Sequence, residues 1–338
     1  MLYMRVDMNN RIATGHIMRC LSIADAAKTL GEQTTFILAD NQAKSLVQKR
    51  GHRAVVLRTP WDDKQAEFPV LLRTIRKYGI RRILVDSYQV TPAYLGELKK
   101  YTEVYYIDDL NAFHYPVDAL ICYANYWKTF RHRDNYENVK LYLGTQYTPL
   151  RNMFSDCGRK EIKAGVESLL LLSGGSDPYD VLEGILKGIH RERYRRIDVI
   201  CGIYHSKYRQ LCQKYKKDEN VRIYRGIPDI ASYMQDADLA ISAGGTTLYE
   251  LCAMGTPAIS YSFTDNQLEN VRKFDMDGLI SYAGDMRKDA VVEHIAGYLE
   301  YYGQNQNVRQ ERSLRMQEFV DGKGAMRVAE VLMEGNPG

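Results

Sequence analysis

Short apolar runs alternate with amphipathic stretches along the first half of the chain. The apolar runs have the length and composition of buried strands. They lie at 2–6, 34–38, 54–57, 82–85, 104–107 and 119–122. Apolar residues at helical spacing fill most of the intervals, at 15–30, 41–49, 64–77 and 92–101. This alternation predicts a mostly parallel sheet with helices on both faces.

The second half of the chain repeats the same alternation. Its predicted strands lie at 168–172, 197–200, 222–224, 239–242, 258–261 and 279–282. Its predicted helices lie at 178–190, 206–215, 230–235, 246–254, 267–274 and 290–302, with a final pair reaching Met333. The pattern breaks between 143 and 165. We therefore predict an α/β protein with two Rossmann-like domains, 1–150 and 151–338, that face each other across a cleft.

The bulk composition narrows the class of protein without defining its function. A hydrophobic content of 45% and a charged content of 26% are ordinary for a globular enzyme, and the net charge of +4 does not call for nucleic acid as a partner. The six cysteines show no metal-like spacing, which fits a reducing compartment. The chain starts without the apolar run of a signal peptide, and it has no segment long enough to span a bilayer. We expect a cytoplasmic protein with no integral membrane segment, no metal and no cofactor.

The first strand leads into a loop that is suited to chemistry. The strand ends at Asp7, a polar loop follows, and Gly15 and His16 open a helix. A strand, a glycine-containing loop and a helix in this order place the loop at the carboxyl edge of a parallel sheet, where α/β proteins bind ligands. The positive end of the helix dipole disfavours a protonated imidazole there, which leaves a neutral base. The alternative is that His16 is an ordinary residue of the first helical turn.

Two further loops in the second half have the composition of phosphate-binding loops. One strand runs into Ser173-Gly174-Gly175-Ser176-Asp177, and another into Gly244-Gly245-Thr246-Thr247 with Glu250 one turn into the next helix. Free backbone N–H groups at such helix starts bind anions, and the glycines allow a diphosphate to come close. A carboxylate at the depth of Glu250 can accept hydrogen bonds from ribose hydroxyls. The alternative is a helix with routine threonine caps and a solvated glutamate.

Other polar residues stand at the predicted strand ends of both halves. Asp86-Ser87-Tyr88, Asp108-Asp109 and Asn125 follow strands of the first half, and Asn266 follows a strand of the second. No further carboxylate or histidine accompanies the aspartate pair at a suggestive spacing, so capping or hydrogen bonding is favoured over a metal site. A turn at 224–229 could pair with a pyrimidine edge, although alone it is typical of a plain turn.

Several of these segments resemble the PseG/SpsG family. This family contains the UDP-2,4-diacetamido-2,4,6-trideoxy-β-L-altropyranose hydrolase of pseudaminic acid biosynthesis and the spore coat polysaccharide biosynthesis protein SpsG. The most specific similarity is the opening RVDMNNRIATGHIMRCL, in which Gly15-His16 is followed by Arg19. Matching segments then occur in family order along nearly the whole chain. They are Asp86 to Tyr88, Ile107 to Asp109, Asn125, Gly144 to Arg151, Ser173 to Asp177, Ile241 to Glu250, and Asp265 to Gln267.

The resemblance implies a GT-B fold similar to the glycosyltransferase MurG, with the nucleotide on the C-terminal domain. It implies that His16 is catalytic and that Tyr88 and Asn266 lie close to the sugar. The sugar-binding set that we predict is completed by Asp7, Gly15, Arg19, Asp108 and Asn125. The UDP-binding set comprises Gly174, Gly175, Ser176, Ile227, Gly244, Gly245, Thr246, Thr247 and Glu250, in which Ile227 meets the uracil through its backbone.

Together these features predict hydrolysis of a UDP-linked amino-deoxy sugar to UDP and free sugar. His16 would activate a water that attacks the anomeric carbon with inversion, and Asp7 either orients the imidazole or caps the loop. One alternative is a GT-B glycosyltransferase that uses the same UDP-sugar and activates an acceptor hydroxyl. Another is a non-catalytic nucleotide-sugar binding protein. The exact sugar, the glycan pathway and any oligomeric partner stay open.

Overall fold

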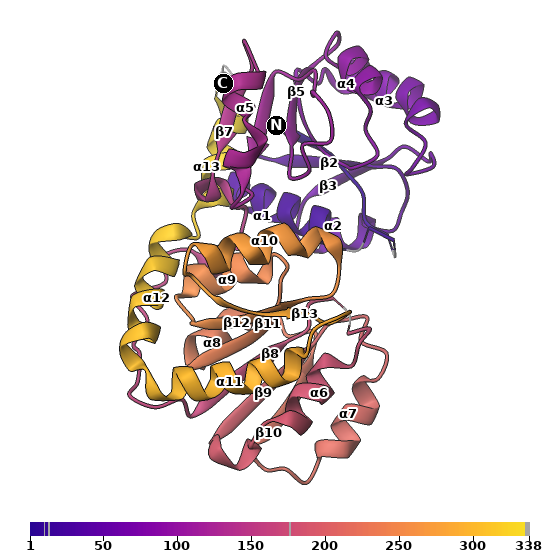
Figure 1. Cartoon of the computed structure of the whole chain (residues 1–338). Helices are drawn as coiled ribbons and strands as arrows, with labels where there is room; N and C mark the ends of the chain where they lie inside the picture. Colours follow the sequence, from indigo (N-terminus) through magenta and orange to yellow (C-terminus); the bar gives the residue numbers. More distant parts are fainter. Residues whose placement is uncertain (10, 13, 176, 335–338) are drawn as a thin grey trace. The chain divides into compact units, whose positions relative to one another are not determined.

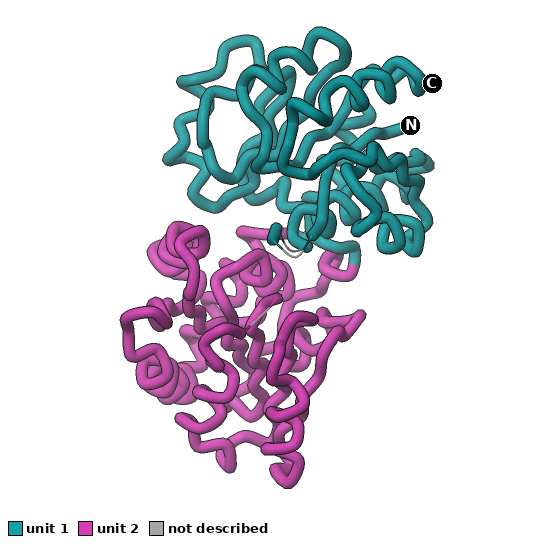
Figure 2. Tube along the Cα trace, turned by 90° about the vertical axis from the view of Figure 1, so that its right-hand side faces the viewer, with its two compact units in different colours: residues 1–152, 322–338 teal, residues 153–321 magenta. Residues whose placement is uncertain are grey.

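The computed structural model describes residues 1–9, 11–12, 14–175 and 177–334. These residues form two compact units, drawn in different colours in Figure 2. Unit 1 comprises residues 1–152 together with 322–338, and unit 2 comprises residues 153–321. In the part of the chain so described, no helix combines the length and the apolar character needed to cross a membrane.

Unit 1 is built on a seven-stranded sheet in which every pairing is parallel. The strand order is β3-β2-β1-β4-β5-β6-β7, and Figure 1 labels β2, β3, β5 and β7 among these strands. The strands are β1 (Leu2–Val6), β2 (Thr34–Leu38), β3 (Arg53–Val56), β4 (Arg82–Asp86), β5 (Glu103–Ile107), β6 (Ala119–Cys122) and β7 (Lys140–Leu143). The helices are α1 (Gly15–Thr29), α2 (Lys44–Lys49), α3 (Lys64–Tyr78), α4 (Pro92–Leu98), α5 (His132–Asn135) and α13 (Gly324–Met333).

Helices cover both faces of this sheet, as the sequence pattern predicts. On one face, buried residues of α1 such as Ile17 and Leu21 share a core with Val47 of α2. On the other face, Leu71 of α3 and Leu95 of α4 pack together in a second core. Apolar residues three and four apart on each helix supply these cores because they lie on one side of a 3.6-residue turn.

Unit 2 has a six-stranded parallel sheet in the order β10-β9-β8-β11-β12-β13. The strands are β8 (Ser168–Leu172), β9 (Arg196–Cys201), β10 (Val221–Arg225), β11 (Leu239–Ala243), β12 (Ala258–Ser262) and β13 (Ser281–Asp285). The helices are α6 (Val181–Gly188), α7 (Tyr208–Tyr215), α8 (Ile230–Asp236), α9 (Thr247–Met254), α10 (Asp265–Met276), α11 (Val291–Gln304) and α12 (Gln306–Phe319). In both units, the strand order reverses beside the first strand, which is the position where doubly wound sheets bind ligands.

The structure differs from the predicted division of the chain at its C-terminal end. Residues 322–338 belong to unit 1 and not to the unit that precedes them. The reason is that α13 packs against α1, and its buried Val328 and Leu332 join the core that contains Ile17. The strand β7 was also missed, because its four residues, two of them only half-buried, give a weak pattern.

Candidate active site

The first turn of α1 presents two polar side chains to the carboxyl edge of the unit 1 sheet. His16 and Arg19 are three residues apart and therefore lie on the same side of the helix. Both side chains are buried. In the preceding loop, the Asn9 side-chain oxygen accepts hydrogen bonds from the backbone N–H groups of Arg11 (2.9 Å) and Ile12 (3.0 Å). The Asn9 side chain thus holds the backbone of Arg11 and Ile12.

Asp86 is the carboxylate that contacts the imidazole. It ends β4, where it is the register partner of Val6 in β1, so strand pairing brings it to the loop that carries His16. His16 Nδ1 lies 2.5 Å from Asp86 Oδ1. Because an ionised carboxylate can only accept, Nδ1 carries the hydrogen, and Nε2 keeps a lone pair that can take a proton.

Arg19 holds the same carboxylate from a second direction. Its Nε lies 2.6 Å from Asp86 Oδ2 and its Nη2 lies 2.5 Å from Oδ1. Its Nη1 donates to Asp109 Oδ2 (2.7 Å) and to the Tyr123 hydroxyl (2.6 Å). Every nitrogen of the guanidinium is therefore engaged within the protein, which makes Arg19 a residue that positions Asp86. The predicted contact of Arg19 with the sugar stays a prediction.

Electrostatics keep Asp86 ionised. Burial by itself raises the pKa of a carboxyl group, but the charges of Arg19 and then His16 oppose it and hold the pKa of Asp86 well below its usual range. The carboxylate is thus available as an acceptor for the Nδ1–H group of His16 at neutral pH.

Tyr88 lies on the exposed side of the His16, Asp86 and Arg19 side chains. Its hydroxyl donates to Asp109 Oδ2 over 2.9 Å, and its ring meets the His16 ring edge to face, with centroids 4.4 Å apart. Since Arg19 also binds Asp109, one network joins these four residues. Tyr88 thus lies next to His16, and its predicted proximity to the sugar stays a prediction.

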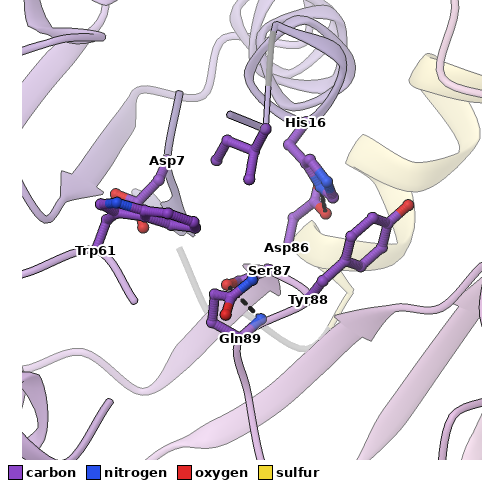
Figure 3. Close-up of a pocket in the computed structure, with 8 residues that line it drawn as sticks. Asp7, His16, Trp61, Asp86, Ser87, Tyr88 and Gln89 are labelled. Carbon is purple, nitrogen blue, oxygen red and sulfur yellow. Dashed lines mark hydrogen bonds and ion pairs between the residues drawn. The ribbon is translucent and has the colours of Figure 1, made fainter. Parts of the chain in front are cut away.

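A small pocket lies beside this network, with about 10 Å³ of enclosed space, which is room for about one water molecule. Figure 3 shows Asp7 and Trp61 on one side of it, and His16 with Tyr88 on the other. The residues that line the pocket are Asp7, Ile12, His16, Trp61, Asp86, Ser87, Tyr88 and Gln89. In the described ranges, no group of three or more His, Cys, Asp or Glu side chains is arranged to hold a metal ion.

Asp7 lines this pocket but does not orient the imidazole. Its Oδ1 accepts a hydrogen bond from the backbone N–H of Ala39 (2.9 Å), and its Oδ2 lies 2.7 Å from Arg5 Nη1. Of the two roles predicted for Asp7, orienting His16 or capping the loop, the first is therefore wrong. The Asp7 carboxylate is held by Arg5 of β1 and by Ala39, which follows β2. Asp86 is the residue that orients the imidazole of His16.

Asp108 contacts other residues than those of the His16 network. Asp108 is buried, its Oδ1 accepts from the backbone N–H groups of Leu110 and Asn111, and its Oδ2 lies 3.2 Å from His132 Nε2. Its neighbour Asp109 is the residue that reaches the network, and the sugar-binding role of Asp108 stays a prediction. Asn125 is buried after β6. Gly15 is exposed, with open space where a Cβ would stand.

In unit 2, the glycines of the two predicted phosphate-binding loops differ in how much space surrounds them. A Cβ on Gly244 would stand 2.0 Å from Val271 Cγ1, so glycine is needed there for α10 to pack. Gly245 has no heavy atom within 4 Å of the corresponding position. Gly174 has φ +74° and, like Gly175, open space beside it. These loops follow β8 and β11, which are neighbours in the sheet.

The helix that follows the first glycine pair begins later than predicted. α6 starts at Val181, and the Asp177 carboxylate accepts hydrogen bonds from the N–H groups of Val181 (2.8 Å) and Leu182 (3.0 Å). These two N–H groups are thus occupied by a side chain of the protein. Ser176, a predicted UDP-binding residue, lies outside the described residues.

The helix after the second glycine pair has a different start. Thr246 is the N-cap of α9 and makes no side-chain cap hydrogen bond, and Thr247 is the first helical residue. Glu250 is half-buried in the first turn. Ile227 is half-buried in the turn between β10 and α8. Asn266 is exposed at the start of α10, where its Oδ1 accepts from the Thr264 hydroxyl (2.6 Å).

Sequence reasoning missed Trp61 and Gln89 as pocket residues and did not assign Asp86 and Asp109 their contacts. Asp86 stood among the strand-end residues, so the signal for it was present. Trp61 lies in a loop between β3 and α3 whose composition is typical of a turn. Its only signal was the rarity of tryptophan, of which the chain has two.

The chain is similar to several known proteins. Residues 169–323 match the glycosyltransferase family 28 C-terminal domain. The spore coat polysaccharide biosynthesis protein SpsG of Bacillus subtilis is 23% identical over 338 residues, which cover 95% of this chain and 94% of SpsG. The uncharacterized protein MJ1062 of Methanocaldococcus jannaschii is 22% identical over 267 residues, or 75% of this chain, and this chain spans about half of that protein, 54% of its length.

A further relative is similar over part of the chain. The UDP-N-acetylglucosamine–N-acetylmuramyl-(pentapeptide) pyrophosphoryl-undecaprenol N-acetylglucosamine transferase of Helicobacter pylori strain G27 is 30% identical over 139 residues. These residues cover 39% of each chain.

Solved structures define the fold over the full length. MurG of Acinetobacter baumannii has a TM-score of 0.70 at 13% identity, with 99% of this chain and 100% of that chain covered. UDP-GlcNAc 2-epimerase of Neisseria meningitidis, solved with UDP-GlcNAc bound, has a TM-score of 0.68 at 12% identity, with 99% and 100% covered. The fold is GT-B, and the prediction of two parallel-sheet α/β domains is confirmed.

Proposed function

We propose that this protein hydrolyses a UDP-linked amino-deoxy sugar of the 2,4-diacetamido-2,4,6-trideoxyhexose type to UDP and free sugar. The observation that carries the proposal is the pair of His16 and Asp86. The carboxylate fixes the hydrogen on Nδ1, and Nε2 can then act as a general base beside a small pocket with room for about one water molecule. The similarity to SpsG along nearly the whole chain supports a role in polysaccharide or nonulosonic acid assembly.

In the proposed reaction, Nε2 of His16 takes a proton from a water molecule as the water oxygen bonds to the anomeric carbon. The bond from that carbon to the UDP oxygen breaks, and UDP leaves as an anion on the opposite face, so configuration inverts. The imidazolium that forms is stabilised by the carboxylate of Asp86, which Arg19 keeps ionised. A positioned base of this kind contributes about 10²- to 10⁴-fold to the rate.

The proposal assigns the nucleotide to unit 2. The start of α9 lacks a side-chain cap and follows Gly245, whose open side lets a phosphate approach the backbone. Glu250 stands one turn further along the helix, where it would accept hydrogen bonds from the ribose. The match of residues 169–323 to a glycosyltransferase domain covers these residues and supports the assignment.

A second candidate is a glycosyltransferase that uses the same UDP-sugar. Two findings favour it: the family 28 match and the similarity to the Helicobacter pylori transferase. His16 would then deprotonate an acceptor hydroxyl and not a water. The residues are the same in both reactions, so the nucleophile alone separates them.

The test uses purified protein and a UDP-diacetamido-trideoxyhexose without acceptor, followed by NMR. Stoichiometric free sugar of inverted anomeric configuration is expected from the wild type. His16→Asn is expected to lower turnover at least about a hundredfold and to leave UDP affinity within about twofold. Turnover of His16→Asn near the wild-type rate would refute the base. Release of sugar only after an acceptor is added would favour the transferase, and UDP-sugar binding without any turnover would favour a non-catalytic binder.

A further inference from the structure

We propose that the small pocket beside His16 admits water as the nucleophile and excludes larger acceptors, and that Trp61 and Ile12 set this limit. The proposal rests on the proposed function, because it concerns the nucleophile of the same reaction. Hydrolysis and glycosyl transfer use the same UDP-sugar and differ in the group that attacks. The residues that limit the size of this group therefore decide between the two reactions.

The space next to the imidazole is small. The His16 side chain is buried, and the pocket that it lines encloses about 10 Å³. A space of this size holds about one water molecule. A hydroxyl group of a sugar or a lipid brings at least one carbon atom with it, and the pocket has no room for that carbon. Such an acceptor would overlap with the walls of the pocket.

Three polar groups of the pocket lining are suited to hold one water molecule. Nε2 of His16 can accept a hydrogen bond from it, because Nδ1 carries the ring hydrogen. The Ser87 hydroxyl accepts from the N–H of Gln89 (3.2 Å) and has no acceptor for its own O–H among the described residues, so it can donate to the water. The Asp7 carboxylate can accept the second O–H of the water, since a carboxylate has acceptor sites beyond those already in use. A buried water makes about three hydrogen bonds, and the lining supplies them.

Two side chains form the apolar part of the lining. Trp61 lies across the pocket from His16 (Figure 3), and Ile12 also lines it. The backbone is held at both positions. Lys64 Nζ donates to the backbone oxygen of Trp61 (3.2 Å), and the N–H of Ile12 donates to the Asn9 side chain (3.0 Å). Because widening the pocket would break these hydrogen bonds, the two walls resist the entry of an additional carbon atom.

An alcohol in place of water makes the size limit measurable. The alcohol oxygen would bond to the anomeric carbon, its hydroxyl proton would pass to Nε2 of His16, and UDP would leave with the electron pair of the broken bond. The product is then a glycoside of inverted configuration and not the free sugar. Methanol is the smallest alcohol and has one carbon more than water. The ratio of methyl glycoside to free sugar, divided by the ratio of methanol to water in the solvent, therefore measures how strictly the pocket excludes that carbon.

The experiment incubates the protein and UDP-2,4-diacetamido-2,4,6-trideoxyhexose in mixtures of water and methanol, and NMR quantifies both products. A sample without protein corrects for methanolysis in solution. In the wild type, the normalised ratio is expected to favour water about tenfold or more, since one additional carbon in a filled space has a cost of that order. In Ile12→Ala and Trp61→Ala, the normalised ratio is expected to rise about tenfold, because the wider pocket removes this cost. The affinity for UDP is expected to stay unchanged.

The chain offers a matched control in its other tryptophan. Trp127 lies in the short helix η1 (Trp127–Phe130), outside the lining of the pocket. Trp127→Phe is expected to keep the product ratio of the wild type, whereas Trp61→Phe is expected to raise it. Trp61→Phe also serves as the conservative variant if Trp61→Ala does not fold.

The outcomes separate this proposal from the proposed function. A wild type that forms free sugar and methyl glycoside in proportion to the solvent would overturn the size limit and leave the hydrolase intact. Wild-type ratios in folded Ile12→Ala and Trp61→Phe would overturn the role of these two residues. If the wild type prefers methanol or a glycan acceptor to water, the transferase is favoured and both proposals fail. If no mixture supports turnover, the proposed function fails, and the size limit fails with it.

Discussion

Replacing Asp86 with asparagine should show how much the orientation of the imidazole contributes to activity and how much the carboxylate contributes to the stability of unit 1. The carboxylate accepts the Nδ1–H group of His16 and two hydrogen bonds from Arg19. An amide of the same size has one acceptor atom and presents N–H groups where these donors point. The hydrogen on His16 then no longer has to stay on Nδ1, and Nε2 is no longer held as the base.

The expected loss of activity follows from that change. A misplaced imidazole hydrogen removes most of what a general base contributes, so we expect kcat to fall about 10²- to 10⁴-fold. In free energy this is about 3–5 kcal/mol of transition-state stabilisation. Removing one partner of a buried ion pair costs stability of about 3–5 kcal/mol. Since Arg19 keeps Asp109 as a partner, we expect the lower end of that range.

The assay measures both quantities on the same preparations. UDP release gives kcat at a temperature well below the melting transition, and urea denaturation gives the free energy of unfolding of unit 1. The matched control is Asp108→Asn, another buried aspartate after a strand, which contacts His132 and has no contact with His16. It should lose stability but keep kcat within about tenfold. A folded Asp86→Asn protein with kcat within tenfold of the wild type would refute the reasoning.

Two more predictions concern the buried charges and the glycine pairs. Burial raises the pKa of Glu67, but the charge of Arg5 outweighs it and holds the pKa at about 2, so Glu67 stabilises unit 1 above its unfolded pKa of 4.5 and loses this effect as the pH falls toward 2. The effect is at most about 3 kcal/mol, because burial and Arg5 also lower the pKa of Lys64, and this opposes the stabilisation by Glu67. When the wild type and Glu67→Gln are denatured between pH 2 and 7, the free energy of unfolding should fall less steeply with decreasing pH in the variant. Equal slopes would contradict the assignment. Gly244→Ala should destabilise unit 2 by about 1–3 kcal/mol through overlap with Val271, whereas Gly245→Ala should leave stability unchanged and weaken UDP binding. Calorimetry and UDP titration of both variants check this, and equal UDP affinity of Gly245→Ala and the wild type would remove Gly245 from the nucleotide site.

Much of the fold could be predicted from local patterns. The buried runs that became β1 and β8 are nearly continuous apolar segments, and such segments belong to strands covered on both faces. Where a predicted helix start differs from the observed one, a nearby side chain explains the shift. α6 begins at Val181 and not at Pro178, because the carboxylate of Asp177 caps the later start.

The candidate site could be predicted in outline but not in its pairings. His16 and Tyr88 follow β1 and β4, and both line the pocket. Which aspartate would meet the imidazole was not accessible, since Asp7 is nearer in sequence. Trp61 was missed because a loop residue leaves no periodic signal.

The sequence by itself determined the type and order of the elements and the loops that carry reactive side chains, because these depend on residues that are neighbours along the chain. Only the tertiary structure decided the partners. The pairing of β1 with β4 brings Asp86 to His16 across 70 residues, while Arg5 and Ala39 take the carboxylate of Asp7. It also decided that α13 returns to α1. The physical reason is that buried charges and apolar faces must find partners, and the strand order selects which ones lie within reach.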